Sequence, residues 1–230
     1  PTNPFLSLFN MDILAVIIMM MVGYMGLILS LFAARYMAGD RHYRQFFYRL
    51  SFLVVSVMCI SAADNLIVLL AAWGMSNFLL VRLMIHKPQW QAAANAGRLA
   101  AKTFLVGFVC LATAFTALYF CSGKTSIQAI IVSVDTTNPV AITALLLIAI
   151  AAMTQSAIWP FHKWLLSSLN SPTPVSAIMH AGLVNGGGVL LARFAPLYLA
   201  QPKLLTGLFL IGICTAFIGS FWKLIQSDIK

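Results

Sequence analysis

The fold of this chain is decided by one interrupted stretch, Trp159 to Gly188, which reads WPFHKWLLSSLNSPTPVSAIMHAGLVNGGG. It places three prolines, two histidines, a lysine and a glycine triplet between long apolar segments. Pro160 lacks a backbone donor and its ring clashes with the preceding turn, so we expect a helix to break near Trp159. Lipid offers no hydrogen-bond partner, so carbonyl groups freed at that depth must be met by protein or water.

Polar residues gather around this predicted break and could meet those carbonyl groups: Gln155, Ser156, His162 and Lys163. Beyond Pro172, Thr173 is typical of a helix N-cap and Pro174 of a first helical position, so a new helix is expected there. A broken helix followed by a restart is a device with which transporters line a polar path. The alternative is a simple loop outside the bilayer.

The restarted helix carries further candidates for a polar path. His180 is either a neutral side chain hydrogen-bonded between helices or a proton-relay group, because histidine titrates near neutrality and ionisable groups inside membranes mark pathways. Asn185 is either a contact between helices or a contact to a water chain. Gly182 and Gly186 form a small-xxx-small pair that lets another helix approach closely.

Composition places this stretch in a membrane protein. The 230 residues are 61% hydrophobic and only 8% charged, whereas about a quarter of a soluble domain is charged. We therefore expect an all-α, polytopic transmembrane bundle that forms one domain over residues 1–230. The apolar runs predict about seven spans, at residues 11–34, 46–62, 65–85, 99–121, 139–159 with a half-helix at 162–169, 174–194 and 204–224.

Charge sets the expected orientation. There are 14 Lys and Arg residues against five Asp and no Glu, and the seven-span topology puts eleven of the cations on one side and three on the other. This asymmetry follows the positive-inside rule, so the N-terminus is expected outside and the basic loops in the cytoplasm. Lipid, rather than nucleic acid, is the partner that such cations indicate. Arg82 and Lys102 are expected to extend to the cytoplasmic surface.

Other residue types argue against a soluble-type catalytic or metal site. The four cysteines lie in apolar surroundings without CxxC spacing, so we expect reduced packing residues rather than a zinc site. No phosphate-binding loop, HExxH or Ser/His/Asp grouping is present, so we expect no catalytic residue, no metal and no cofactor in this chain. Asp64 is a candidate cap for the third span, and residues 123–139 suit a short surface helix or hairpin.

Four segments carry a resemblance to a known family. QSAIWPFHKWLLSSLNSPTPVSAIMHAGLV, ARYMAGDRHYRQFF, SAADNLIVLLAAW and the terminal LIQSDIK resemble the antiporter-like membrane subunits of respiratory complex I (the subunit-L branch) and of Mrp antiporters. The resemblance implies a proton-translocating fold with paired inverted five-helix bundles, each with a broken helix. This chain is similar to the N-terminal half of such a subunit, and both of its ends look cut.

The chain departs from the family pattern at three positions where the family places charges. Gly74 stands where a Glu follows the Trp of the third span, and Gln155 stands where a Lys precedes Ser-Ala. Phe108 stands at the position of an Arg in the fourth span. His180, Lys102 and Lys230 are kept. The resemblance therefore implies that the family's charge-shuttling cycle cannot run here unaltered.

One branch of the family fits these departures. HKPQW, together with LNSPTPVSAIMHAGLVNGGGVLLARFAPL, resembles the membrane subunits (DabB) of DAB inorganic-carbon pumps of the bacterial inner membrane. That branch implies a large, zinc-containing, carbonic-anhydrase-like partner of the DabA type on the cytoplasmic face, with zinc and CO2 hydration in the partner. A complex I-type or Mrp-type pump, and a scaffold that transports nothing, remain the alternatives.

Overall fold

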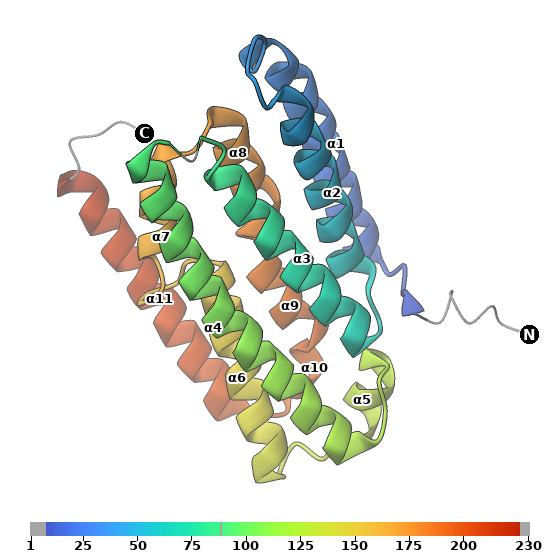
Figure 1. Ribbon diagram of the computed structural model, residues 1–230. Helices are drawn as coiled ribbons and strands as arrows, with labels where there is room; N and C mark the ends of the chain where they lie inside the picture. The colour runs from blue at the N-terminus through green and yellow to red at the C-terminus, as the bar shows by residue number, and fades with distance from the viewer. Residues whose placement is uncertain (1–7, 88, 226–230) are drawn as a thin grey trace, which may run out of the picture.

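The computed structural model describes residues 8–87 and 89–225 and shows a bundle of roughly antiparallel helices (Figure 1). Within these residues, six helical segments are long and apolar enough to cross a membrane, and a shorter apolar helix joins them. The continuous ones are α1 (Ile13–Tyr36), α2 (Tyr43–Ala62), α3 (Leu66–Met84), α4 (Gln91–Ser122), α11 (Pro202–Ile225) and the shorter α6 (Pro139–Gln155). The remaining span comprises α8 (Thr173–Ile178), the π-helix η3 (Met179–Leu183) and α9 (Gly186–Arg193). The predicted all-α transmembrane bundle is confirmed.

Short helices connect these spans. They are α5 (Ile127–Ser133), α7 (Lys163–Ser167), the 3₁₀ turn η2 (Ser168–Asn170) and α10 (Ala195–Leu199). The connection at 123–139, expected to hold a short helix or a hairpin, contains α5. The half-helix expected at 162–169 is split between α7 and η2.

Four helices, α1, α3, α5 and α6, begin where a side chain caps the first turn. Asp12 accepts a hydrogen bond from the Ala15 amide at 2.7 Å at the start of α1, and Asn138 caps α6 just before Pro139. The expected cap of the third span was wrong, because Asn65 rather than Asp64 caps α3 through the Ile67 amide at 2.9 Å.

Asp64 has a different partner because it lies one residue before the cap. Its carboxylate accepts hydrogen bonds from the Ser126 hydroxyl at 2.6 Å and the Gln128 amide at 3.2 Å. These two bonds satisfy the start of α5 and fix it against the α2–α3 turn.

Two other boundaries differ from the prediction. α4 begins at Gln91 instead of residue 99, because an alanine-rich segment continues the helix beyond the apolar run. The N-cap position before α8 is occupied by Pro172 without a side-chain hydrogen bond, and the helix begins at Thr173. Thr173, expected as the cap, is therefore already helical.

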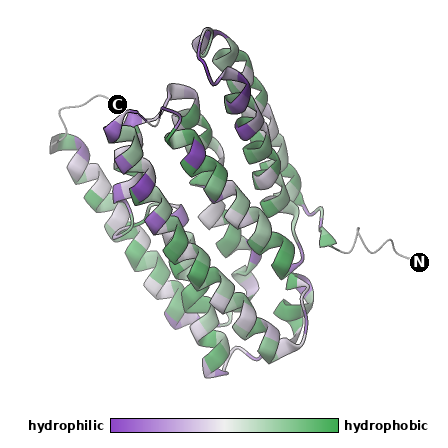
Figure 2. Cartoon of the chain, viewed as in Figure 1, coloured by the Kyte–Doolittle hydropathy of each residue, from purple (hydrophilic) through white to green (hydrophobic). Residues whose placement is uncertain are grey.

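Charged residues separate the two ends of the bundle. The α1–α2 and α3–α4 connections meet at one end, here called the basic end, where hydrophilic residues gather (Figure 2). The cations of these connections and their flanks are Arg35, Arg41, Arg44, Arg82, Lys87 and Arg98. At the opposite end Arg193 is buried: it donates to the Asp12 carboxylate at 3.1 Å and to the Ser61 carbonyl. Arg193 thus joins α9 to α1 and α2.

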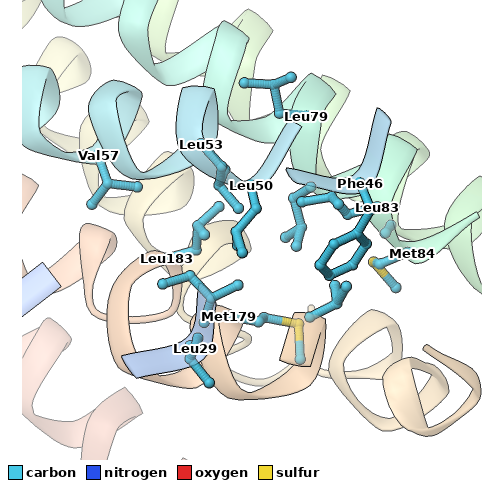
Figure 3. Close-up of a cluster of buried hydrophobic side chains, with 14 of the residues drawn as sticks. Leu29, Phe46, Leu50, Leu53, Val57, Leu79, Leu83, Met84, Met179 and Leu183 are labelled. Carbon is cyan, nitrogen blue, oxygen red and sulfur yellow. The ribbon is translucent and has the colours of Figure 1, made fainter. Parts of the chain in front are cut away.

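The apolar interior forms two clusters stacked along the bundle. In the one nearer the basic end, side chains of α2 lie opposite Met179 and Leu183 of the π-helix and Leu29 of α1 (Figure 3). The other joins α3, α4, α6 and α9 farther from that end. Because lipid is as apolar as these side chains, close packing rather than water exclusion holds the helices together.

The backbones of α6 and α9 approach closely at Gly187. A Cβ at Gly187 would overlap the Ala152 carbonyl oxygen and the Ser156 hydroxyl. At the predicted Gly182 and Gly186 pair an added Cβ would make only ordinary contacts, such as 3.6 Å to the Gln155 side chain at Gly186. Gly187, rather than that pair, is the residue that permits the approach.

We expect Gly187→Ala to destabilise the protein by about 1–3 kcal/mol, because the helices must separate. Gly188→Ala is the matched control, since a Cβ there meets nothing within 4 Å, and it should be neutral or raise the stability by up to about 1 kcal/mol. Thermal unfolding in detergent measures both. Equal melting temperatures for the two variants would contradict the close approach.

Candidate coupling site at the helix break

The helix break begins earlier than the sequence predicted. α6 ends at Gln155, Ser156 is its C-cap, and Ala157 has a left-handed φ of 53°. A proline ring clashes with the carbonyl group four residues before it, which for Pro160 is that of Ser156. The expected break at Trp159 was therefore four residues too late, although the cause was correct.

Protein groups satisfy two carbonyl oxygens at the end of α6 and one on the facing span. The indole Nε1 of Trp164 donates to the Thr154 carbonyl at 3.0 Å, and the Ser156 hydroxyl donates to the Val184 carbonyl at 2.7 Å. The Ile158 amide bonds the Met153 carbonyl at 3.0 Å. Ser156 was among the predicted partners. Trp164 was missed, because its sequence position beside Lys163 does not show that its ring turns back toward α6.

The break lies at mid-height of the bundle. The rings of Trp164 and Phe104 are 4.7 Å apart, and Gly107 lies against Thr154. Both α4 residues are close to the middle of a helix about 48 Å long. This position favours a broken helix inside the bundle over a loop outside the bilayer.

The facing span is also interrupted, which the sequence did not predict. The π-helix at Met179–Leu183 closes with the Val184 amide on the Met179 carbonyl at 3.0 Å. The side-chain amide of Asn185 donates to the Ala181 carbonyl at 3.3 Å and so satisfies part of the unwound turn. π-helical turns are frequent at functional sites. The span predicted over 174–194 is present as Thr173–Arg193, but the π-helical turn within it was not predicted.

A small cavity, lined mainly by apolar side chains, lies between the two interruptions. Its polar lining comes from Ser61, Trp73, Ser76 and Gln155, with Gly182 and Gly186 on the facing span. The Trp73 Nε1 and the Gln155 Oε1 are buried without a hydrogen-bond partner in the described residues. The cavity measures about 10 Å³, close to the space that one water molecule needs. One water could therefore bridge these neutral groups.

The charges that the resemblance implies are replaced by packing. A Cβ at Gly74 would lie 2.8 Å from the Phe108 ring, so the phenyl group fills the space beside the glycine. Asn77, next along α3, is buried and both atoms of its amide lack a partner in the described residues. The groups on this side of the break are polar but neutral.

The remaining predicted residues do not join this cavity. His180, Asn185, Lys163 and Lys102 are exposed on the described bundle. Asp64 lies near the opposite end, and Lys230 is outside the described residues. Of the predicted candidates, only Gln155 lines the cavity.

His162 lies on the other side of the break. Its ring is half-buried, 4.6 Å from the ring of Trp222 in α11. Its Nδ1 has no hydrogen-bond partner in the described residues. The roles expected for His162 and for the residues outside the cavity stay predictions.

Among the described residues, no group of three His, Cys, Asp or Glu side chains is placed to hold a metal ion.

Sequence reasoning also missed Arg193 as a buried residue. A signal was present, because an arginine within an apolar span calls for a partner, and Asp12 precedes the first span.

A family model described as "NADH:quinone oxidoreductase/Mrp antiporter, TM" matches residues 63–230. The chain is 34% identical, over 95% of its length, to the "Probable inorganic carbon transporter subunit DabB1" of Halothiobacillus neapolitanus. It is 35% identical, over 96%, to the corresponding DabB subunit of Bacillus anthracis. It spans only 40% and 44% of these relatives.

Two further similarities reach other branches of the family. The chain is 32% identical, over 96% of its length, to "NADH-ubiquinone oxidoreductase chain 5" of Cryptococcus neoformans, and spans 34% of it. The structure of the Mrp complex from Dietzia sp. DQ12-45-1b superposes with a TM-score of 0.72 and 29% identity. That match covers 79% of this chain and 20% of the other.

We expect Trp164→Phe to destabilise the protein by about 1–3 kcal/mol, because it leaves the buried Thr154 carbonyl without its donor while it keeps the ring against Phe104. Trp159→Phe is the control: it removes an indole that is 50% exposed and should change stability by less than about 0.5 kcal/mol. Thermal unfolding in detergent compares them. Similar losses in both variants would count against the Trp164 bond.

Proposed function

Because the chain belongs to the NADH:quinone oxidoreductase/Mrp antiporter membrane family, we propose that it is part of the membrane subunit of an energy-coupled inorganic carbon (CO2/bicarbonate) accumulation complex. The similarity to two DabB subunits over nearly all of this chain supports this assignment. In this proposal the subunit couples ion flow, expected to be of protons, to a partner that forms bicarbonate. It is a transporter subunit and not itself an enzyme.

The observation that carries the proposal is the neutral packing around the break. Gly74 lies against Phe108, and Gln155 is buried and lines the small cavity with Trp73 and Ser76. The family resemblance places Glu, Arg and Lys at these three positions. A charge shuttle of the complex I type needs ionisable side chains there, so their replacement favours the inorganic-carbon branch.

A proton route through this region would depend on water and on His180. The neutral groups of Trp73, Ser76 and Gln155 can hold a water molecule but cannot store a proton at neutral pH. His180, on the facing span, is the imidazole proposed for the relay, and it is exposed on the described bundle. A relay function would therefore operate at the surface that His180 shares with the rest of the protein or with a partner.

The partner is expected at the basic end. A large zinc protein of the carbonic-anhydrase-like DabA type would contact these loops on the cytoplasmic face of a bacterial inner membrane. The first span would then start from the outside, and zinc and CO2 hydration would be in the partner. The concentration of arginine and lysine at this end supports that orientation.

Two other functions are carried as alternatives. Similarity to chain 5 of the NADH-ubiquinone oxidoreductase and to the Mrp complex favours a proton-translocating or cation-translocating subunit. The loss of charges at Gly74 and Gln155 favours a scaffold that tethers a partner without moving ions. The identity of the co-purified partner distinguishes the first alternative from the proposal. The effect of a His180 substitution on uptake distinguishes the second alternative from the proposal.

We expect the tagged full-length protein, extracted in a mild detergent, to retain a large soluble-type subunit together with zinc in fixed proportion. Mass spectrometry and elemental analysis measure both, with an unrelated tagged membrane protein as the control. Recovery of quinone-reductase or antiporter subunits in place of a zinc protein would contradict the proposal and support the first alternative.

We expect His180→Ala to lower inorganic-carbon uptake by roughly a hundredfold while assembly is kept, because a titratable group that passes protons typically contributes that much. His42→Ala, which changes an exposed histidine in the α1–α2 connection, should leave uptake unchanged. Full uptake in His180→Ala, at equal protein level in the membrane, would favour the scaffold.

A further inference from the structure

A second, larger and more polar cavity lies at the basic end, away from the helix break. It measures about 560 Å³ and is enclosed by the α1–α2 connection, the α3–α4 connection and the segment that leads into α8. A volume of this order is typical of small-ligand sites. The residues that give it chemical character are Tyr36, Asp40, His86, Lys87, Trp90 and Thr173.

Two titratable side chains form its inner wall. The His86 side chain is 1% exposed, and its Nε2 lies 3.2 Å from Asp40 Oδ1. Neither ring nitrogen makes an aligned hydrogen bond within the described residues. Asp40 is therefore the charged group beside this buried imidazole.

The wall presents a carboxylate to the cavity. Asp40 Oδ1 accepts the His42 amide at 2.8 Å, and this hydrogen bond holds the pKa of Asp40 below its usual value. Burial lowers the pKa of His86, so the imidazole is neutral near pH 7. Asp40 therefore carries a negative charge that His86 does not neutralise, and it favours a ligand with a cationic group.

The rim presents a charge of the opposite sign and two aromatic rings. Lys87 lines the cavity and is exposed. Tyr36, at the end of α1, and Trp90, just before α4, are each 51% exposed. Half-exposed Tyr and Trp at the ends of spanning helices lie at the level of lipid headgroups. A ligand that suits the site therefore carries both charges close together and reaches it from the membrane interface.

We propose that this cavity binds the headgroup of a zwitterionic phospholipid with a primary ammonium, of the phosphatidylethanolamine class. The ammonium donates hydrogen bonds to the Asp40 carboxylate, and the phosphate accepts from the Lys87 ammonium. The glycerol and the start of the acyl chains lie against the aromatic rings of the rim. The site is independent of the function proposed above, because it needs neither a partner nor an ion route.

The charges at the basic end favour a zwitterionic ligand over a purely anionic or a purely cationic one. A purely anionic headgroup would bring its phosphate against Asp40, whose charge lies within the wall. A purely cationic ligand would have to pass Lys87 and the neighbouring Arg41 and Arg44. A quaternary ammonium fits the aromatic rings but has no N–H group for the carboxylate. These differences give the order in which lipids should bind.

The experiment measures lipid retention by native mass spectrometry of the full-length protein. The detergent-purified protein is exchanged with vesicles of phosphatidylethanolamine, phosphatidylcholine or phosphatidylglycerol. We expect phosphatidylethanolamine to be retained in preference to the other two. Asp40→Asn and Lys87→Gln should each weaken its retention about tenfold. Arg41→Gln, which removes a charge from the same end but not from the cavity lining, should leave it unchanged.

Three results would overturn the proposal. They are equal retention of all three lipids, normal retention in Lys87→Gln, and an equal loss in Arg41→Gln. Soluble glycerophosphoethanolamine forms a further arm: if it competes as well as the lipid, the ligand is a soluble zwitterion and the lipid assignment is wrong. Lys87→Gln keeps the test decisive if Asp40→Asn fails to fold, because Lys87 is exposed. The carbon-uptake and zinc measurements do not depend on any of these outcomes.

Discussion

The structure depends on how backbone polar groups are satisfied where two facing spans lose their helical hydrogen bonds at mid-height. A lipid-facing break would leave carbonyl oxygens without partners. Here the Trp164 indole and the Ser156 hydroxyl meet two of them, one within the broken segment and one on the facing span. Because Ser156 bonds the end of the π-helical segment, the two interruptions support each other and fix the position of α6 against α9.

This arrangement places uncharged residues where the family resemblance implies charges. Gly74 and Phe108 pack against each other, and Gln155 turns into a cavity large enough for about one water molecule. A buried charge in this region would need a partner. Because the three positions hold uncharged residues, no such partner is required. What remains is an interior with a few neutral polar groups, whereas His180, Lys163 and Lys102 are exposed on the described bundle.

The charged side chains at the two ends of the bundle have different surroundings. At the end that holds α5, Asp64 and Arg193 are tied to backbone and hydroxyl groups, and Arg193 also to Asp12, so their charges hold helices together. At the basic end, the exposed cations are available to the aqueous phase and to lipid headgroups, and Asp40 with His86 forms the wall of a cavity among them. The charges at the first end join helices, whereas those at the basic end surround a cavity.

The sequence by itself determined the fold class, the spans and the cause of the break, since apolar length, charge asymmetry and proline chemistry are local properties. It could not place the break at Gln155, predict the π-helix at Met179–Leu183, or give Asp64 its partner in α5. Those features arise between segments far apart in the chain: Ser156 with Val184, Trp164 with Thr154, and Asp64 with Ser126. Which polar residues share a cavity was likewise decided only by tertiary structure, because helix rotation is set by packing against neighbours, and the sequence of one helix does not specify it.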